Sequence, residues 1–107
     1  MTARCMVDVD DEKLERGARC IKMLAHPLRL KILMVIGTGE VPVSGILEAI
    51  GTSQSNVSQH LGQMRDKGIL IARRDANQVF YRVREPKVFE LLALVRELFC
   101  EPGGAGR

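Results

Sequence analysis

Several features are missing from this 107-residue sequence. It has no apolar run long enough to form a transmembrane helix. Its first ten residues contain no apolar core of a signal peptide. The three cysteines, Cys5, Cys20 and Cys100, are odd in number and far apart, so they form no disulfide framework and fit a reducing compartment. We therefore expect a cytoplasmic protein of one domain.

The residue sets that mark common enzymes are also missing. The sequence shows no nucleophile–base pair, no phosphate-binding glycine loop and no pair of catalytic carboxylates. We therefore predict that the protein is not an enzyme and look for a binding function instead.

Residues 53–64 contain no Lys, Arg, Asp or Glu, although charged residues make up 27% of the chain. Val57, Leu61 and Met64 are spaced four and three apart, which predicts a helix with one narrow apolar stripe. The other positions carry mostly amides and hydroxyls, which both donate and accept hydrogen bonds. Such a surface suits the base edges in a DNA major groove. The alternative is a solvated surface helix, but those usually carry Glu and Lys.

The residues before this polar helix favour DNA binding. Residues 43–50 predict a short amphipathic helix, and Gly51 suits the left-handed residue that ends it. Thr52 or Ser53 can then cap the polar helix, which we expect at residues 53–66. A helix, a tight glycine turn and a second, polar helix form a helix-turn-helix, whose second helix enters the major groove.

The residues after the polar helix predict a basic β-hairpin. We expect strands at 69–74 and 78–83, joined by a three-residue loop at 75–77. Six basic residues and only two acidic ones lie between residues 65 and 84, whereas residues 8–15 are mainly acidic. A basic hairpin after a recognition helix is a wing that contacts phosphate. The alternative is a solvated charge run.

The remaining chain predicts one mainly α-helical domain with this β-hairpin wing. We expect a mobile arm at 1–10, helices at 11–25, 27–36 and 86–100, a winged helix-turn-helix domain spanning 11–101, and a frayed tail at 102–107. The last helix has nine apolar residues among the twelve at 88–99, more than one amphipathic face needs. A second apolar face implies a partner, and the simplest one is a second copy of the chain, because a two-fold dimer suits two DNA half-sites.

Three stretches together resemble the ArsR-type (ArsR/SmtB) winged-helix repressors over nearly the whole chain. They are Ala-His-Pro-Leu-Arg-Leu-Lys-Ile-Leu at 25–33, Ser-Gln-Ser-Asn-Val-Ser-Gln-His-Leu at 53–61 and Val-Phe-Tyr-Arg-Val at 79–83. The resemblance implies a homodimer that binds double-stranded operator DNA and releases it when an effector binds or reacts. It also implies dimer contacts through the first and last helices, for which we expect Leu14, Ile21, Leu91, Leu94, Val95 and Leu98.

This sequence departs from the family in its sensing residues. Residues 43–47 lack the Cys-x-Cys of the metalloid sensors, and the last helix has no His of the zinc and nickel sensors. Only two histidines exist. We expect His26 to make a structural hydrogen bond before Pro27, and His60 to lie near DNA or phosphate. We therefore expect no first-row metal site and no bound cofactor.

The cysteines are the remaining candidates for a sensor. Cys100 matches one of the two sensing cysteines of a sulfide- and redox-responsive subgroup, but Met34 stands where that subgroup has its second thiol. Cys20 lies on the first helix, which the resemblance places near the last helix in the dimer. Cys20 and Cys100 are thus a candidate dithiol switch, and with Cys5 a candidate site for As(III). The alternatives are a buried apolar role for Cys20 and a bystander role for Cys5.

These observations lead to one main prediction, a repressor released from its operator by an oxidant, persulfide or sulfide that acts on cysteine thiols. The alternatives are a repressor that responds to As(III) through Cys5, Cys20 and Cys100, and a constitutive winged-helix regulator with no thiol sensor. The residues predicted to read bases are Gln54, Ser55, Ser58 and Gln59, with His60 nearby, and the residues predicted to contact DNA from the wing are Arg73, Arg74, Asn77, Gln78 and Arg82.

Overall fold

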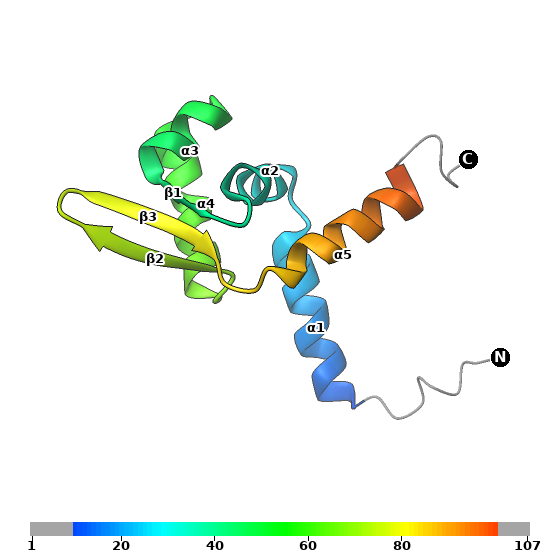
Figure 1. Cartoon of the computed structure of the whole chain (residues 1–107). Coiled ribbons are helices and arrows are strands. Elements are labelled where there is room, and N and C mark those ends of the chain that lie inside the picture. Colours follow the sequence, from blue (N-terminus) through cyan, green and yellow to red (C-terminus); the bar gives the residue numbers. More distant parts are fainter. Residues whose placement is uncertain (1–9, 101–107) are drawn as a thin grey trace.

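The computed structural model describes residues 10–100 and shows a winged helix-turn-helix (Figure 1). In chain order the elements are α1 (Asp11–Leu24), α2 (Pro27–Ile36), β1 (Glu40–Pro42), α3 (Val43–Ile50), α4 (Gln54–Asp66), β2 (Leu70–Asp75), β3 (Gln78–Val83), α5 (Lys87–Val95) and the π-helical turn η2 (Arg96–Cys100). Helices α2, α3 and α4 gather near the base of the β2–β3 hairpin, while α1 and α5 extend to the opposite side. The predicted arm and tail lie outside the described residues, except for Asp10.

Side-chain capping hydrogen bonds begin α2 and α4, at residues for which the sequence predicted a structural hydrogen bond and a helix cap. The His26 Nδ1 accepts a hydrogen bond from the Leu28 amide at 3.2 Å and caps α2, which confirms its structural role. The Ser53 Oγ accepts one from the Asn56 amide at 3.2 Å and caps α4. Gly51 ends α3 in the left-handed conformation, with φ of 77°. These short-range contacts fix the turn of the helix-turn-helix.

The hydrophobic core lies between α2, α3, α4 and the sheet. Its buried members are Ile32, Leu33 and Ile36 of α2, Ile46 and Ile50 of α3, Val57, Leu61 and Met64 of α4, and Leu70, Tyr81 and Val83 of the sheet. The apolar stripe predicted for the polar helix is thus buried, and it fixes which face of α4 remains exposed. Val35 of α2 is only partly buried and packs against this core.

The sheet has one strand more than predicted. Strand β1 pairs antiparallel with β3, with Val41 opposite Tyr81, and gives the order β1-β3-β2. Three residues are too few to show strand alternation, and the hydrogen bonds that define β1 come from residues far along the chain. The hairpin loop is also shorter than predicted, because Asp75 already pairs with Gln78.

The two helices at the ends of the described chain contain no buried residue. Helix α1 ends at Leu24, one residue before the predicted end. The predicted last helix is not uniform, since α5 stops at Val95 and continues as a π-helical turn. No helix among the described residues is long and apolar enough to cross a membrane.

Candidate nucleic-acid interface

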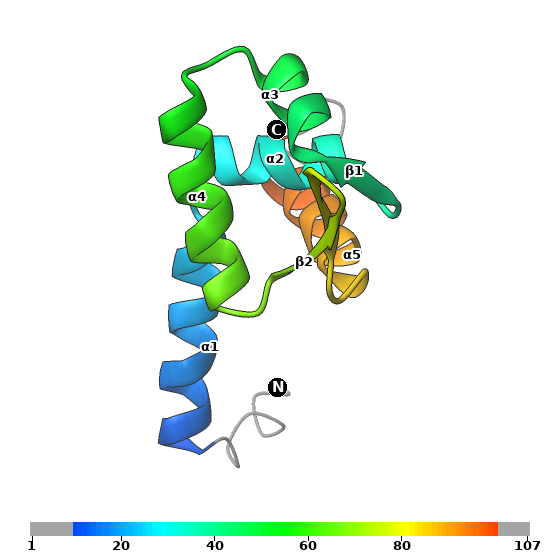
Figure 2. The ribbon, with the colours of Figure 1, turned by 90° about the vertical axis from the view of Figure 1, so that its left-hand side faces the viewer.

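Helix α4 runs along one side of the molecule (Figure 2), and its uncharged polar residues are exposed to solvent. Gln54, Ser55, Ser58 and Gln59 are all exposed, while the stripe on the other side of the helix is buried. The amide and hydroxyl groups of these residues lie within the first two turns of α4, where a recognition helix contacts base edges. The structure therefore brings the four predicted base-reading residues onto one accessible surface.

His60 lies on a different part of α4 from these four residues. Its side chain is partly buried and turns toward the corner between α1 and α2. The His60 Nδ1 accepts a hydrogen bond from the Arg29 Nε at 2.9 Å, and its ring centroid is 4.5 Å from that of His26. His60 therefore has intramolecular partners that the sequence did not predict.

The two consecutive arginines of the wing lie on opposite faces of the sheet. Arg74 pairs with Val79, and their face of the sheet continues through Ala72 and Tyr81 toward the helices. Arg73 pairs with Phe80 on the other face. Because side chains alternate along a strand, the two guanidinium groups cannot both face the same side. A DNA duplex on one side of the sheet would therefore be closer to one of these two arginines than to the other.

Arg73 is held by an intramolecular network. Its guanidinium donates hydrogen bonds to both carboxylate oxygens of Glu40, at 2.8 and 3.0 Å, and stacks 4.7 Å from the Phe80 ring centre. The hydrogen bond from Arg73 holds the pKa of Glu40 below its ordinary value, and the same bond raises the pKa of Arg73. Asp75 lies 3.6 Å from Arg73 as well. Two carboxylates thus offset the charge of Arg73.

The other predicted wing residues are exposed. Arg74, Asn77 and Gln78 lie at or beside the loop, and Arg82 lies opposite Glu40 in the register of β1 and β3. The loop itself turns at Ala76, whose φ is +59°. Arg74 has no hydrogen bond or ion pair with any residue that the structure describes, so its charge is available to a phosphate.

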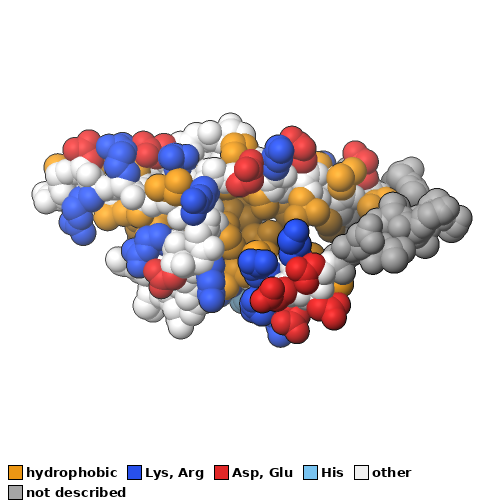
Figure 3. All heavy atoms as spheres, turned by 90° about the horizontal axis from the view of Figure 1, so that it is seen from below, with side chains coloured by type: hydrophobic (Ala, Val, Ile, Leu, Met, Phe, Trp, Pro, Cys, Tyr) orange, Lys and Arg blue, Asp and Glu red, His pale blue; other side chains and the backbone are white. Residues whose placement is uncertain are grey.

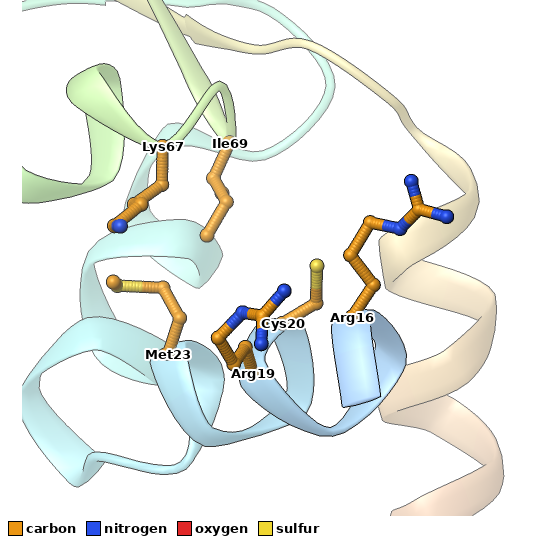
Figure 4. Close-up of a pocket in the computed structure, with 6 residues that line it drawn as sticks. All are labelled: Arg16, Arg19, Cys20, Met23, Lys67 and Ile69. Atoms are coloured by element: carbon orange, nitrogen blue, oxygen red, sulfur yellow. The ribbon is translucent and has the colours of Figure 1, made fainter. Parts of the chain in front are cut away.

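Cys20 lies on α1 and lines a small cavity with basic walls (Figure 4). The cavity has a volume of about 130 Å³ and is lined by Arg16, Arg19, Cys20, Met23, Lys67 and Ile69. Figure 4 shows the Cys20 sulfur directed into the space between α1 and the segment that carries Lys67 and Ile69. Cys20 is an exposed free thiol, so the alternative of a buried apolar role is wrong.

The predicted approach of Cys20 to Cys100 depends on the course of α5 and η2 relative to α1. A neighbouring groove of about 430 Å³ joins Cys20 to Val88 and Leu91 in the first half of α5. Cys100 ends η2, nine residues beyond Leu91, which is roughly 13 Å at a helical rise of about 1.5 Å per residue. A disulfide needs Cα atoms within about 7 Å, so this arrangement favours pairing between subunits over pairing within one.

The side chains of Cys100 and Cys5 lie outside what the structure describes, and the predicted three-cysteine site is therefore untested. Within the described part of the chain, no three His, Cys, Asp or Glu side chains form a group that could hold a metal ion.

Apolar side chains are exposed on α1, α5 and η2. The predicted dimer residues Leu14, Ile21, Leu91, Leu94, Val95 and Leu98 are 40–63% exposed, and Phe99 is 76% exposed. Figure 3 shows hydrophobic atoms open to solvent in the hollow between the acidic end of α1 and the rest of the molecule. These side chains have little to contact within one subunit.

Comparison with known proteins identifies relatives over most of the chain. The model of the bacterial regulatory protein, arsR family, matches residues 26–72, which include α2, α3 and α4. A probable mercury resistance operon repressor from Streptomyces lividans is 40% identical over 88 residues, covering 82% of this chain and 70% of that protein.

Two solved structures extend the match to the whole fold. The transcriptional repressor BigR from Xylella fastidiosa is 34% identical, with a TM-score of 0.77, and the match covers 94% of this chain and 99% of that one. The homodimeric winged helix-turn-helix DNA-binding domain of Mb0332 from Mycobacterium bovis is also 34% identical, with a TM-score of 0.69, covering 83% of this chain and 85% of that one.

Proposed function

Because this chain belongs to the ArsR family of bacterial transcription regulators, and its relatives are named as regulators and not as enzymes, we propose that it is a homodimeric repressor of operator DNA. One observation carries the proposal. Helix α4 is held by a buried apolar stripe and exposes an uncharged, hydrogen-bonding surface beside a wing with a free arginine. A protein that reads bacterial operators acts in the cytoplasm.

In this proposal Gln54, Ser55, Ser58 and Gln59 contact base edges in the major groove. The test uses an operator selected from random DNA with the parent protein. Replacing both Gln54 and Gln59 by Ala removes two candidate base contacts, each worth about 1–3 kcal/mol. Operator affinity should fall at least tenfold, while affinity for scrambled DNA changes little. Unchanged operator affinity in the folded double variant would reject α4 as the reading helix.

Two copies of the chain would bind through the exposed apolar side chains of α1 and α5. The homodimeric Mycobacterium bovis relative supports this arrangement. A symmetric dimer places two recognition helices in successive major grooves, roughly 34–36 Å apart. Any change that tilts α1 against α5 would alter this spacing and weaken operator binding.

The proposed effector acts on cysteine thiols. Cys20 supports this role because it is exposed and lines the groove between α1 and the base of α5, at the elements proposed to form the dimer. In the redox version, Cys20 of one subunit and Cys100 of the other form a disulfide. The two thiols lose two electrons and two protons to an added oxidant such as diamide.

A second version is a soft metal or metalloid held by Cys20, Cys100 and Cys5. It is favoured by the relative from Streptomyces lividans, which is named as a probable mercury resistance operon repressor. Thiolates are the ligands that soft ions prefer. This version requires Cys5, whereas the disulfide does not.

Operator release by Cys5→Ser, Cys20→Ser and Cys100→Ser variants separates these versions. Each is measured with diamide, persulfide, arsenite and mercury(II). Loss of the response in the last two variants alone indicates the disulfide, and loss in all three indicates the three-thiolate site. If every variant releases DNA like the parent, the cysteines are bystanders. If neither the parent nor any variant responds, a constitutive regulator is favoured.

A further inference from the structure

Arg29 connects three helices through a single guanidinium group. It is the third residue of α2, and its Nη1 donates a hydrogen bond to the Met23 carbonyl of α1 at 3.0 Å. The same nitrogen also contacts the Met23 sulfur. On the other side, its Nε donates to the His60 Nδ1 at 2.9 Å and its Nη2 donates to the Gln63 side-chain oxygen, both on α4. Arg29 therefore links the proposed dimer helix α1 to the proposed reading helix α4.

The link to His60 requires a neutral imidazole. A nitrogen that accepts a hydrogen bond from Arg29 cannot carry a proton itself. Burial lowers the pKa of His60 below its ordinary 6.5, and electrostatic interactions with His26 and Arg29 lower it further. Protonation would remove the acceptor and place an imidazolium against a guanidinium.

Among the described residues, the charged groups that act on His60 are His26 and Arg29, and neither would compensate for that proton. His26 and Arg29 face His60 from the start of α2. The groove beside Arg29 is lined by Arg19 and Lys22 of α1, together with Lys67 just after α4, so the charged side chains that line this groove are all cationic. Protonated His60 would therefore be repelled from the corner between α1 and α2.

We propose that Arg29 is a positioning residue, which holds α4 against α1 through neutral His60 and makes operator binding sensitive to acidification. The inference rests on α4 being the reading helix, but it does not depend on the cysteines. The core stripe keeps α4 attached to the domain, while the Arg29 contacts set its orientation relative to α1. Because α1 belongs to the proposed dimer surface, these contacts also set the position of α4 relative to the two-fold axis.

The first test measures the ratio of operator affinity to scrambled-DNA affinity from about pH 8 to about pH 5.5. A ratio is needed because each added positive charge strengthens all phosphate binding. In the parent protein the ratio should fall about tenfold on acidification, as expected for one lost hydrogen bond to a charged group.

Two histidine variants provide a matched pair. His60→Asn keeps an acceptor near the Nδ1 position but cannot be protonated, so its ratio should stay high and should not vary with pH. His26→Asn also removes one imidazole and retains a capping oxygen for α2, so its ratio should still fall on acidification, although at a slightly higher pH because His26 no longer lowers the pKa of His60. A parent-like pH dependence in His60→Asn would overturn the proposal.

Arg29→Lys keeps the charge but loses the fork that reaches three partners. We expect its affinity ratio to be about tenfold lower at neutral pH and independent of pH. An unchanged ratio and pH profile in Arg29→Lys would also overturn the proposal. If Arg29→Lys fails to fold, the comparison of His60→Asn with His26→Asn still tests the proposal.

A second measurement needs no DNA. Nitrogen chemical shifts of the His60 ring in the parent dimer should show an unprotonated Nδ1 at neutral pH, and titration of His60 should shift amide signals in α4. A protonated Nδ1 at neutral pH would reject the Arg29 link, whatever the outcome with operator DNA. If α4 is not the reading helix, the Gln54→Ala, Gln59→Ala double variant will instead keep the operator affinity of the parent.

Discussion

The segment from α2 to β3 and the pair formed by α1 and α5 use apolar side chains in different ways. All eleven buried core residues belong to the first region, and none lies in α1 or α5. Most of the exposed large apolar side chains belong to the second region or to η2, which continues α5 and carries Leu98 at 61% and Phe99 at 76% exposed. The first region buries its apolar surface within one subunit, whereas the second leaves its apolar surface exposed, as the proposed dimer interface would require. Stability and assembly should therefore respond to different substitutions.

The largest expected effect is the difference in stability loss between a Leu→Ala substitution in the first region and one in the second. Leu61, in the core, is 1% exposed and Leu94, on α5, is 54% exposed. Leu61→Ala should lower the free energy of unfolding by about 2–5 kcal/mol, because it leaves a cavity between α4 and the rest of the core. Leu94→Ala should have a much smaller effect at a concentration where the chain is monomeric. Urea denaturation measures both, and equal losses would contradict the division into two regions.

The next largest expected effect is the loss of the proposed dimer, with each subunit still folded. Ile21→Glu and Leu94→Glu each place a charge within the exposed apolar surface. Sedimentation should show monomers with a normal circular dichroism spectrum. Operator affinity should fall on the order of a hundredfold or more, because two linked half-site contacts become independent. Glu90→Gln, an exposed substitution on the same helix, is the control and should remain dimeric. Dimers in both glutamate variants would reject this surface as the interface.

A smaller effect separates the two faces of the wing. Arg74→Ala should flatten the dependence of DNA affinity on salt by about one unit, because one phosphate contact is lost. Arg73→Ala should change it less, since Glu40 and Asp75 already offset that charge. Glu40→Gln should release Arg73 and steepen the salt dependence. A larger change in salt dependence for Arg73→Ala than for Arg74→Ala would show that the face of the sheet that carries Arg73 contacts DNA.

The smallest expected effect is on the pH dependence of stability. The pKa of His60 is lower in the folded protein than its ordinary 6.5, so the unfolded chain binds more protons between these two values. Stability contributed by neutral His60 is therefore present above pH 6.5 and is lost as the pH falls toward the folded pKa. Denaturation at several pH values should show a shallower slope for His60→Asn than for the parent. Identical slopes would contradict the lowered pKa.

The amino-acid sequence by itself determined the helix-turn-helix and the regular part of the wing. The stripe of Val57, Leu61 and Met64, the Ser53 cap and the left-handed Gly51 all depend on neighbours within a few residues. Interactions of such short range leave a periodic or positional pattern in the sequence, which is why the bounds of α2 and α3 were predicted correctly. The excess of apolar residues near the C-terminus also indicated exposed apolar surface before the structure was known.

Only the tertiary structure decided which polar groups meet. The Arg73–Glu40 pair joins residues 33 positions apart, the Arg29–His60 contact joins residues 31 positions apart, and β1 exists only through its pairing with β3. Strand alternation does place Arg73 and Arg74 on opposite faces, but which face the helices cover depends on how the core packs. Contacts of this kind follow from the path of the whole chain in space, and no local pattern encodes them.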